Sequence, residues 1–173
     1  NFVLLVLMSL SSFAEERHYE LRVHHTTKNI TGVDVDHALA INESIPAPTL
    51  RFNLGDDAVI KVINETSEPT TLHWHGLLVP WEQDGPQFSN TKIIEPNTTH
   101  TFRFPIRHTG TYWYHSHTEL QEQRGLYGAI VIEEDQPLVE VDHDFVYVMS
   151  DWTNEIPKAV LYNLKKDGDY YGM

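Results

Sequence analysis

The stretch from residue 99 to residue 117, THTFRFPIRHTGTYWYHSH, decides the fold class. Apolar and polar side chains alternate along its first seven residues, and aromatic residues crowd the part from 111 to 117. Both patterns are typical of β-strands, and the intervening His108-Thr109-Gly110 is typical of a turn. The stretch therefore predicts two short strands joined by a turn.

Segments of the same kind recur on both sides of it. We expect strands at residues 19–24, 38–41, 49–52, 58–64, 70–75 and 128–133. Short strands at this spacing indicate an all-β sandwich or barrel. Before residue 137 only the segment 119–124 could form a turn of helix. A length of 173 residues with 40% hydrophobic composition is enough for one such domain with a core.

Composition narrows the possible functions. The net charge of −13 argues against nucleic-acid binding through phosphate contacts and suits a protein that handles cations. The chain has no cysteine, which excludes disulfides, thiolate metal sites and cysteine nucleophiles within it. Its 11 histidines are many for this length.

The first fourteen residues differ from the rest of the chain. They read NFVLLVLMSLSSFA and carry no charge. Their apolar run is too short to span a bilayer, which takes about 20 residues, so we expect no stable membrane insertion. Ser12 and Ala14 frame a cleavage site, and residues 1–14 are interpreted as a signal peptide lacking its basic start. The alternatives are a buried first strand or a short anchor. A signal peptide predicts a periplasmic or secreted protein.

The character of the sequence changes again near residue 137. The acidic segment around it resembles a linker, residues 145–150 (FVYVMS) predict a strand, and Pro157 suits the first turn of a helix that continues to Lys166. One strand and one helix do not make a domain. We therefore expect one domain over residues 15–137, and a linker with the beginning of an incomplete second domain over 138–173.

Two histidine pairs carry the functional information, His73-Trp74-His75 and His115-Ser116-His117. Alternate residues of a strand share a face, so each pair points to one side, with about 6.6 Å between its members at ~3.3 Å per residue. Neutral imidazole is a common ligand for copper, zinc, iron or nickel. In a histidine-rich chain such pairs also arise by chance, so the pairs alone are weak evidence for a metal site.

The residues around the pairs are more specific. HWHG followed by Asp84-Gly85, and GTYWYHSH followed by GLYG at 125–128, resemble the first two of the four copper-binding motifs of multicopper oxidases. The segment LQEQRGLYG at 120–128 and SDWT at 150–153 resemble the bacterial CopA-type copper-resistance oxidases within that family. The resemblance covers roughly residues 18–173.

The resemblance implies a cupredoxin-like Greek-key β-sandwich as the first of three such domains. It implies that His73 binds the type 2 copper, that His75 and His115 bind one copper of the type 3 pair, and that His117 binds the other. Four further histidine ligands would come from a C-terminal cupredoxin domain of the same parent chain.

Three more residues near the motifs have expected roles. Asp84 matches an acidic residue that in the family helps to deliver protons during oxygen reduction, and its alternative role is that of an Asp-Gly turn former. We expect Trp74 and Trp113 to pack around the site rather than to relay electrons.

The expected function is that of the N-terminal part of an oxidase whose partners are copper ions and O2. It would couple oxidation of cuprous ion or a phenol-like substrate to reduction of O2 to water, in copper resistance. Type 1 copper needs a thiolate that this chain lacks, so the chain alone is expected to be inactive. The alternatives are a non-catalytic copper-binding domain and a histidine-rich surface without metal.

Overall fold

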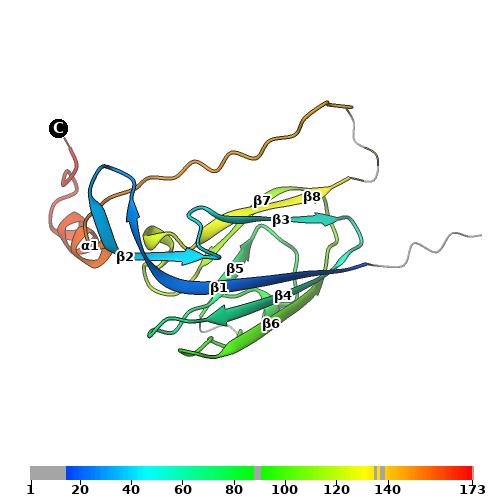
Figure 1. The fold of residues 1–173 in the computed structure, drawn as a ribbon, viewed down its shortest axis with the longest axis horizontal. Helices are drawn as coiled ribbons and strands as arrows, with labels where there is room; N and C mark the ends of the chain where they lie inside the picture. Colours follow the sequence, from blue (N-terminus) through cyan, green and yellow to red (C-terminus); the bar gives the residue numbers. More distant parts are fainter. Residues whose placement is uncertain (1–14, 88–90, 135, 137–138, 173) are drawn as a thin grey trace, which may run out of the picture.

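The computed structural model describes residues 15–87, 91–134, 136 and 139–172, so the predicted signal peptide at residues 1–14 lies outside the described residues. Two four-stranded sheets pack into a sandwich, one ordered β2-β1-β4-β6 and the other β3-β8-β7-β5 (Figure 1). The strands are β1 (Glu16–Asn29), β2 (Asp34–Ile41), β3 (Ala47–Asn53), β4 (Asp57–Asn64), β5 (Leu72–His75), β6 (Thr99–Pro105), β7 (Gly110–Ser116) and β8 (Tyr127–Glu133). The predicted all-β sandwich is confirmed.

Both sheets are mixed. Strand β1 pairs parallel with β4, and β3 pairs parallel with β8, while the other neighbours are antiparallel. Strand β1 is much longer than the predicted 19–24 because it pairs with β2 through its second half and with β4 through its first. Partner strands, which a single sequence does not reveal, extend a strand beyond its apolar core.

The core lies between the two sheets and is formed by their inward-facing residues. Phe52 of β3, Phe102 of β6, and Trp74 and Tyr114 of the site-bearing strands are among its largest fully buried side chains. Complete burial of a side chain of this size contributes about 1.5–3 kcal/mol. Trp74 and Tyr114 thus anchor the two strands that carry the histidine pairs to the core.

Beyond β8 the chain continues in an extended conformation along the surface, and the predicted strand at 145–150 is wrong. Phe145 and Tyr147 are exposed, and within the described part of the chain no neighbouring strand pairs with this segment. Side-chain contacts hold it instead, such as the 2.7 Å hydrogen bond between the Ser150 and Tyr127 hydroxyls. An apolar segment forms a strand only where a neighbouring strand pairs with its backbone groups.

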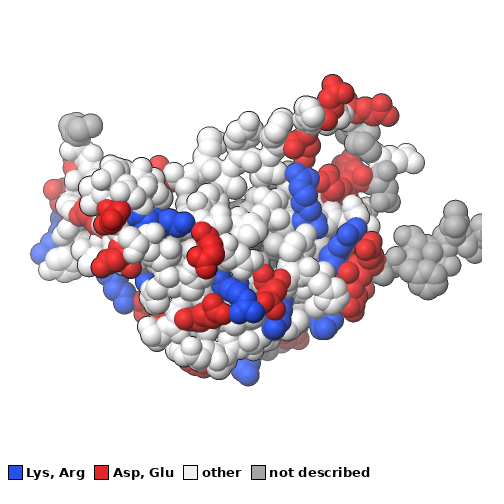
Figure 2. All heavy atoms as spheres, viewed as in Figure 1, with Lys and Arg blue, Asp and Glu red and all other residues white. Residues whose placement is uncertain are grey.

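Two short helical turns and one helix complete the fold: η1 (Trp81–Gln83), η2 (Glu122–Arg124) and α1 (Pro157–Lys166). Helix α1 begins at the predicted proline, and η2 confirms the predicted helical turn between the second histidine pair and β8. Within the described residues, no helix has the length and apolar character needed to cross a membrane. Figure 2 shows acidic and basic side chains interspersed over the face in view.

Candidate metal centre

The pairing of β5 with β7 brings the two histidine pairs together. In this antiparallel ladder His73 lies opposite His115, and His75 lies opposite Trp113. Directly opposed residues of neighbouring strands share a face of the sheet. The side chains of His73, His75 and His115 therefore lie together on the outer face, as the alternation in the sequence predicts.

The inner face of the same two strands is apolar. Trp74 and Tyr114, which also oppose each other, are fully buried, and Trp74 packs edge-on against Phe102 with ring centroids 5.1 Å apart. The Trp74 indole N–H donates to the Gln83 carbonyl at 3.0 Å, which ties the loop after β5 to the strand. The predicted packing role of Trp74 is confirmed. Its burial fixes the register of β5 and so keeps the neighbouring His73 and His75 on the outer face.

Three imidazoles converge on the outer face. The ligand nitrogens of His73, His75 and His115 all lie within 4.8 Å of one another. His75 Nδ1 and His115 Nε2 are 3.3 Å apart. Two ring nitrogens at this distance can direct their lone pairs at one ion between them.

His117 lies at the border of this cluster. It follows the last residue of β7, is exposed, and its ring centroid is 5.7 Å from that of His73 and 6.2 Å from that of His115. The prediction that both members of the second pair lie within the strand therefore holds for His115 only. The end of the strand leaves His117 facing solvent beside the trio.

Backbone and carboxylate oxygens select the tautomers of two of these rings. His73 Nδ1 is 2.7 Å from the Asp84 carbonyl oxygen and 3.4 Å from the Asp84 carboxylate. His115 Nδ1 is 2.9 Å from the Ser116 carbonyl oxygen and 2.8 Å from the Glu122 carboxylate. A carbonyl oxygen only accepts, so each Nδ1 carries the proton and each Nε2 is free to bind a metal.

The electrostatics keep His115 ready for a metal. Burial, opposed by the hydrogen bond to the Ser116 carbonyl and assisted by the nearby His73, His75 and His117, lowers its pKa to about 4. A neutral ring at pH 7 is the form that ligates metals. Burial also raises the pKa of the Glu122 carboxyl above its ordinary value.

The donor set fits copper. It consists of imidazole nitrogens at short mutual distances, with the ligating tautomer selected at two of them and no thiolate in the chain. Such a set suits divalent copper, zinc or nickel, and it excludes a type 1 copper centre built from this chain alone. The residues that would hold the metal are His73, His75 and His115, with His117 adjacent.

Trp113 packs against the site as predicted, whereas the role of Glu122 was not predicted. Trp113 stacks on His115 with ring centroids 4.2 Å apart and contacts His75 at 5.0 Å, although its side chain is 36% exposed. Glu122 stands in the loop seven residues after His115, and nothing in the sequence indicates that this loop folds back onto the ring. The only signal was the position of Glu122 within the segment 120–128 that resembles the copper-resistance oxidases.

Comparison with known proteins agrees with this geometry. A profile of the family described as multicopper oxidase matches residues 22–137. Copper resistance protein A of Escherichia coli is 43% identical over 154 residues, which is 88% of this chain and 25% of that protein. The chain thus spans about a quarter of the length of this curated relative.

Solved structures give the same result. The blue copper oxidase of Nitrosomonas europaea has a TM-score of 0.68 at 35% identity and covers 72% of this chain and 41% of its own. A mutant laccase of B. aclada has a TM-score of 0.74 at 28% identity, over 89% of this chain and 29% of its own. With a matching profile over most of the sandwich and a shared fold beneath the histidine pairs, the chain belongs to the multicopper oxidase family.

Proposed function

We propose that this chain is the N-terminal part of a copper-dependent oxidase that couples oxidation of a reducing substrate to reduction of O2 to water. The relatives named copper resistance protein A support a role in copper resistance, with cuprous ion as the reducing substrate. A relative named laccase keeps a phenol-like substrate open.

One observation carries this proposal: the convergence of three imidazoles, two of them held in the ligating tautomer. We assign His73 to the type 2 copper, His75 and His115 to one copper of the type 3 pair, and His117 to the other. Copper bound there supplies the one-electron chemistry by which O2 is reduced. The chain itself supplies ring orientation, through the core beneath and the oxygens behind the rings.

Asp84 is proposed to deliver protons. Its backbone carbonyl holds His73, while its carboxylate is about one-third exposed and lies 3.4 Å from the same ring. A carboxylate in this position can exchange protons with water on one side and hand them towards the cluster on the other. The backbone contact and the side chain thus have separate tasks, so Asp84→Asn should preserve metal binding and slow proton delivery.

The remaining parts of the oxidase are proposed to lie in a C-terminal cupredoxin domain of the parent chain. Type 1 copper needs a cysteine, and the chain has none. Four further histidine ligands are needed to complete the cluster. We therefore expect the 173-residue chain to bind copper without turning over substrate, with residues 15–137 as its first domain and 138–173 leading into a second.

Export to the periplasm or out of the cell is part of the proposal. It rests on residues 1–14, whose uncharged apolar run ends in small residues before Glu15. Sequencing the N-terminus of the mature protein tests it, and a mature chain that retains these residues would contradict it.

Copper loading tests the ligand assignment. The purified chain is titrated with copper and its content measured by elemental analysis, alongside His75→Ala and His115→Ala. Both variants should lose most of the bound copper. His18→Ala is the matched control, because His18 is an exposed histidine on β1 in the other sheet, paired with Glu16. Equal copper content in all four proteins would refute the assignment.

A second function, copper binding without catalysis, is favoured by the closeness of the trio within one chain. Three nitrogens within 4.8 Å can hold a single ion without help from another domain. Tight binding of one ion, together with a gene that stops after the codon for Met173, would favour this function. A reading frame that continues into a cysteine-containing, histidine-rich motif would favour the oxidase.

A further inference from the structure

Glu122 lies directly behind one of the metal-facing rings. It is the first residue of η2, and its carboxylate is 2.8 Å from His115 Nδ1. The His115 side chain is 8% exposed and that of Glu122 is 33% exposed, so the contact is shielded from bulk water on the ring side. A charge-assisted contact in such surroundings is stronger than one on an open surface.

The contact fixes both the tautomer and the direction of the ring. His115 Nδ1 has two oxygens within reach, the Glu122 carboxylate and the Ser116 carbonyl, and the latter belongs to the neighbouring residue of the strand. The opposite nitrogen, Nε2, then points at His75 Nδ1, 3.3 Å away. Rotation of the ring would break both contacts behind it and turn Nε2 away from the other ligands.

The turn that carries Glu122 is anchored on its N-terminal side by Gln121, whose side chain is buried. The Gln121 amide oxygen accepts hydrogen bonds from the Thr70 hydroxyl at 2.7 Å and the Ser116 hydroxyl at 2.8 Å. Its amide nitrogen donates to the Pro69 carbonyl at 2.9 Å. The residue before Glu122 is therefore bound to the end of β7 and to the segment just before β5.

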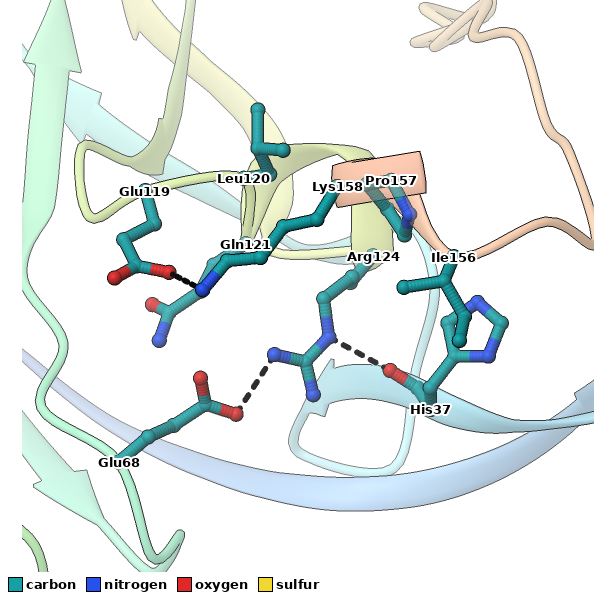
Figure 3. Close-up of a pocket in the computed structure, with 9 residues that line it drawn as sticks. All are labelled: His37, Glu68, Glu119, Leu120, Gln121, Arg124, Ile156, Pro157 and Lys158. Carbon is teal, nitrogen blue, oxygen red and sulfur yellow. Dashed lines mark hydrogen bonds and ion pairs between the residues drawn. The ribbon is translucent and has the colours of Figure 1, made fainter. Parts of the chain in front are cut away.

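Arg124 anchors the turn on its C-terminal side. Its guanidinium donates to the His37 carbonyl and to the Glu68 carboxylate, each at 2.7 Å (Figure 3). These contacts line a cavity of about 220 Å³ between η2 and the start of α1, where Lys158 in turn pairs with Glu119. The two Arg124 contacts tie the C-terminal side of the turn to β2 and to the segment between β4 and β5.

We propose that Glu122 is a positioning residue for the copper centre: its carboxylate holds the Nδ1–H of His115 and thereby aims Nε2 at the metal. This inference rests on the proposed function, since it concerns one of the ligands assigned there. Metal-bound histidines commonly donate their second N–H to a carboxylate, and loss of that partner typically weakens metal binding 10–100-fold. Here the carboxylate is carried by a turn that Gln121 and Arg124 anchor on its two sides.

The experiment compares the 173-residue chain with Glu122→Ala and Glu122→Gln. The first readout needs no metal: nitrogen-15 NMR of the histidine side chains reports which nitrogen of His115 is protonated. The wild type should show the Nδ1–H tautomer, Glu122→Ala a mixture of tautomers, and Glu122→Gln an intermediate state, because its amide oxygen still accepts. Glu119→Gln is the control, since Glu119 lies in the same loop but is exposed and pairs with Lys158.

The second readout is copper affinity, measured by competition with a chelator. Glu122→Ala should bind copper 10–100-fold more weakly than the wild type, Glu122→Gln should retain part of the affinity, and Glu119→Gln should match the wild type. A merely structural role would lower the melting temperature without changing the tautomer. If Glu122→Ala does not fold, the nearly isosteric Glu122→Gln decides alone.

The outcomes separate this inference from the proposed function. The positioning role would be overturned if both Glu122 variants kept the wild-type tautomer of His115 and bound copper with an affinity within twofold of the wild type. A shifted tautomer in Glu122→Ala supports it even if the wild-type chain binds no copper. That last result would count against the proposed function and not against the contact.

Discussion

The loop that holds His73 depends on Gly85, and Gly85→Ala should destabilise the protein strongly. Gly85 has φ +99°, and a Cβ there would overlap the Leu72 carbonyl group, 2.6 Å from its carbon, and lie 2.7 Å from His73 Cα. Real Cβ atoms essentially never approach closer than 3.0 Å. The clash involves the backbone of β5, so no side-chain rotation relieves it and the loop must move.

The expected magnitude follows from what that movement breaks. A left-handed conformation costs a residue with a Cβ about 1–2 kcal/mol. The moving loop also loses the hydrogen bond from the Gly85 N–H to Thr91 Oγ1 and that from Thr71 Oγ1 to the Gly85 carbonyl, both 2.9 Å. At ~1 kcal/mol each, these losses bring the total to roughly 3–4 kcal/mol, or about 10 °C in melting temperature for a chain of this size.

Gly55→Ala is the matched control. Gly55 also has a positive φ, +91°, but a Cβ there meets nothing within 4 Å. It should lose only the conformational part, about 1–2 kcal/mol. Urea unfolding of both variants isolates the clash as the difference between them. If Gly85→Ala unfolds within 0.5 kcal/mol (roughly the error of such measurements) of Gly55→Ala, the reasoning about the loop is wrong.

Three further predictions concern single side chains. Tyr114→Phe should lower the free energy of unfolding by about 1 kcal/mol in urea melts, because the buried hydroxyl that donates to the Pro48 carbonyl at 2.7 Å is lost. Copper should quench tryptophan fluorescence, and Trp113→Leu should lose most of the quenching, because Trp113 stacks on the His115 ring. Burial lowers the pKa of His100 in the folded protein, so the unfolded state binds the proton more readily. The free energy of unfolding is therefore unaffected by this histidine above about pH 6.5 and decreases as the pH falls below that value. His100→Phe should flatten that fall in thermal melts across the same pH range, and an unchanged slope would contradict it.

The sequence predicted the sandwich and the shared face of each histidine pair for the same physical reason. Alternation along β5 and β7 places Trp74 and Tyr114 in the core and their neighbours His73 and His115 outside it. A one-residue shift in register would exchange the two faces, bury the imidazoles and expose the aromatic rings. The large apolar side chains thus determine the position of the polar ones, and the pattern is visible without coordinates.

The failed strand at 145–150 shows the limit of this reasoning. Its residues are apolar and suited to a strand, yet Phe145 and Tyr147 face solvent and no strand pairs with it among the described residues. An apolar sequence indicates that a segment prefers burial. Whether a sheet edge lies beside that segment is a property of the whole fold. The strand pairing of the described residues shows that neither sheet offers an edge to this segment.

Glu122 escaped sequence reasoning for a related reason. The chain between His115 and Glu122 leaves β7 and turns back through η2, so the contact of Glu122 with the ring depends on the anchors of η2 at Gln121 and Arg124. Those anchors bind Ser116 and the His37 carbonyl, the latter from β2 in the opposite sheet. Local alternation therefore determines which face the proposed ligands share, whereas their orientation depends on contacts between distant parts of the chain. A variant that keeps every histidine but loosens η2, such as Arg124→Met, should consequently weaken copper binding while leaving the ligand set intact.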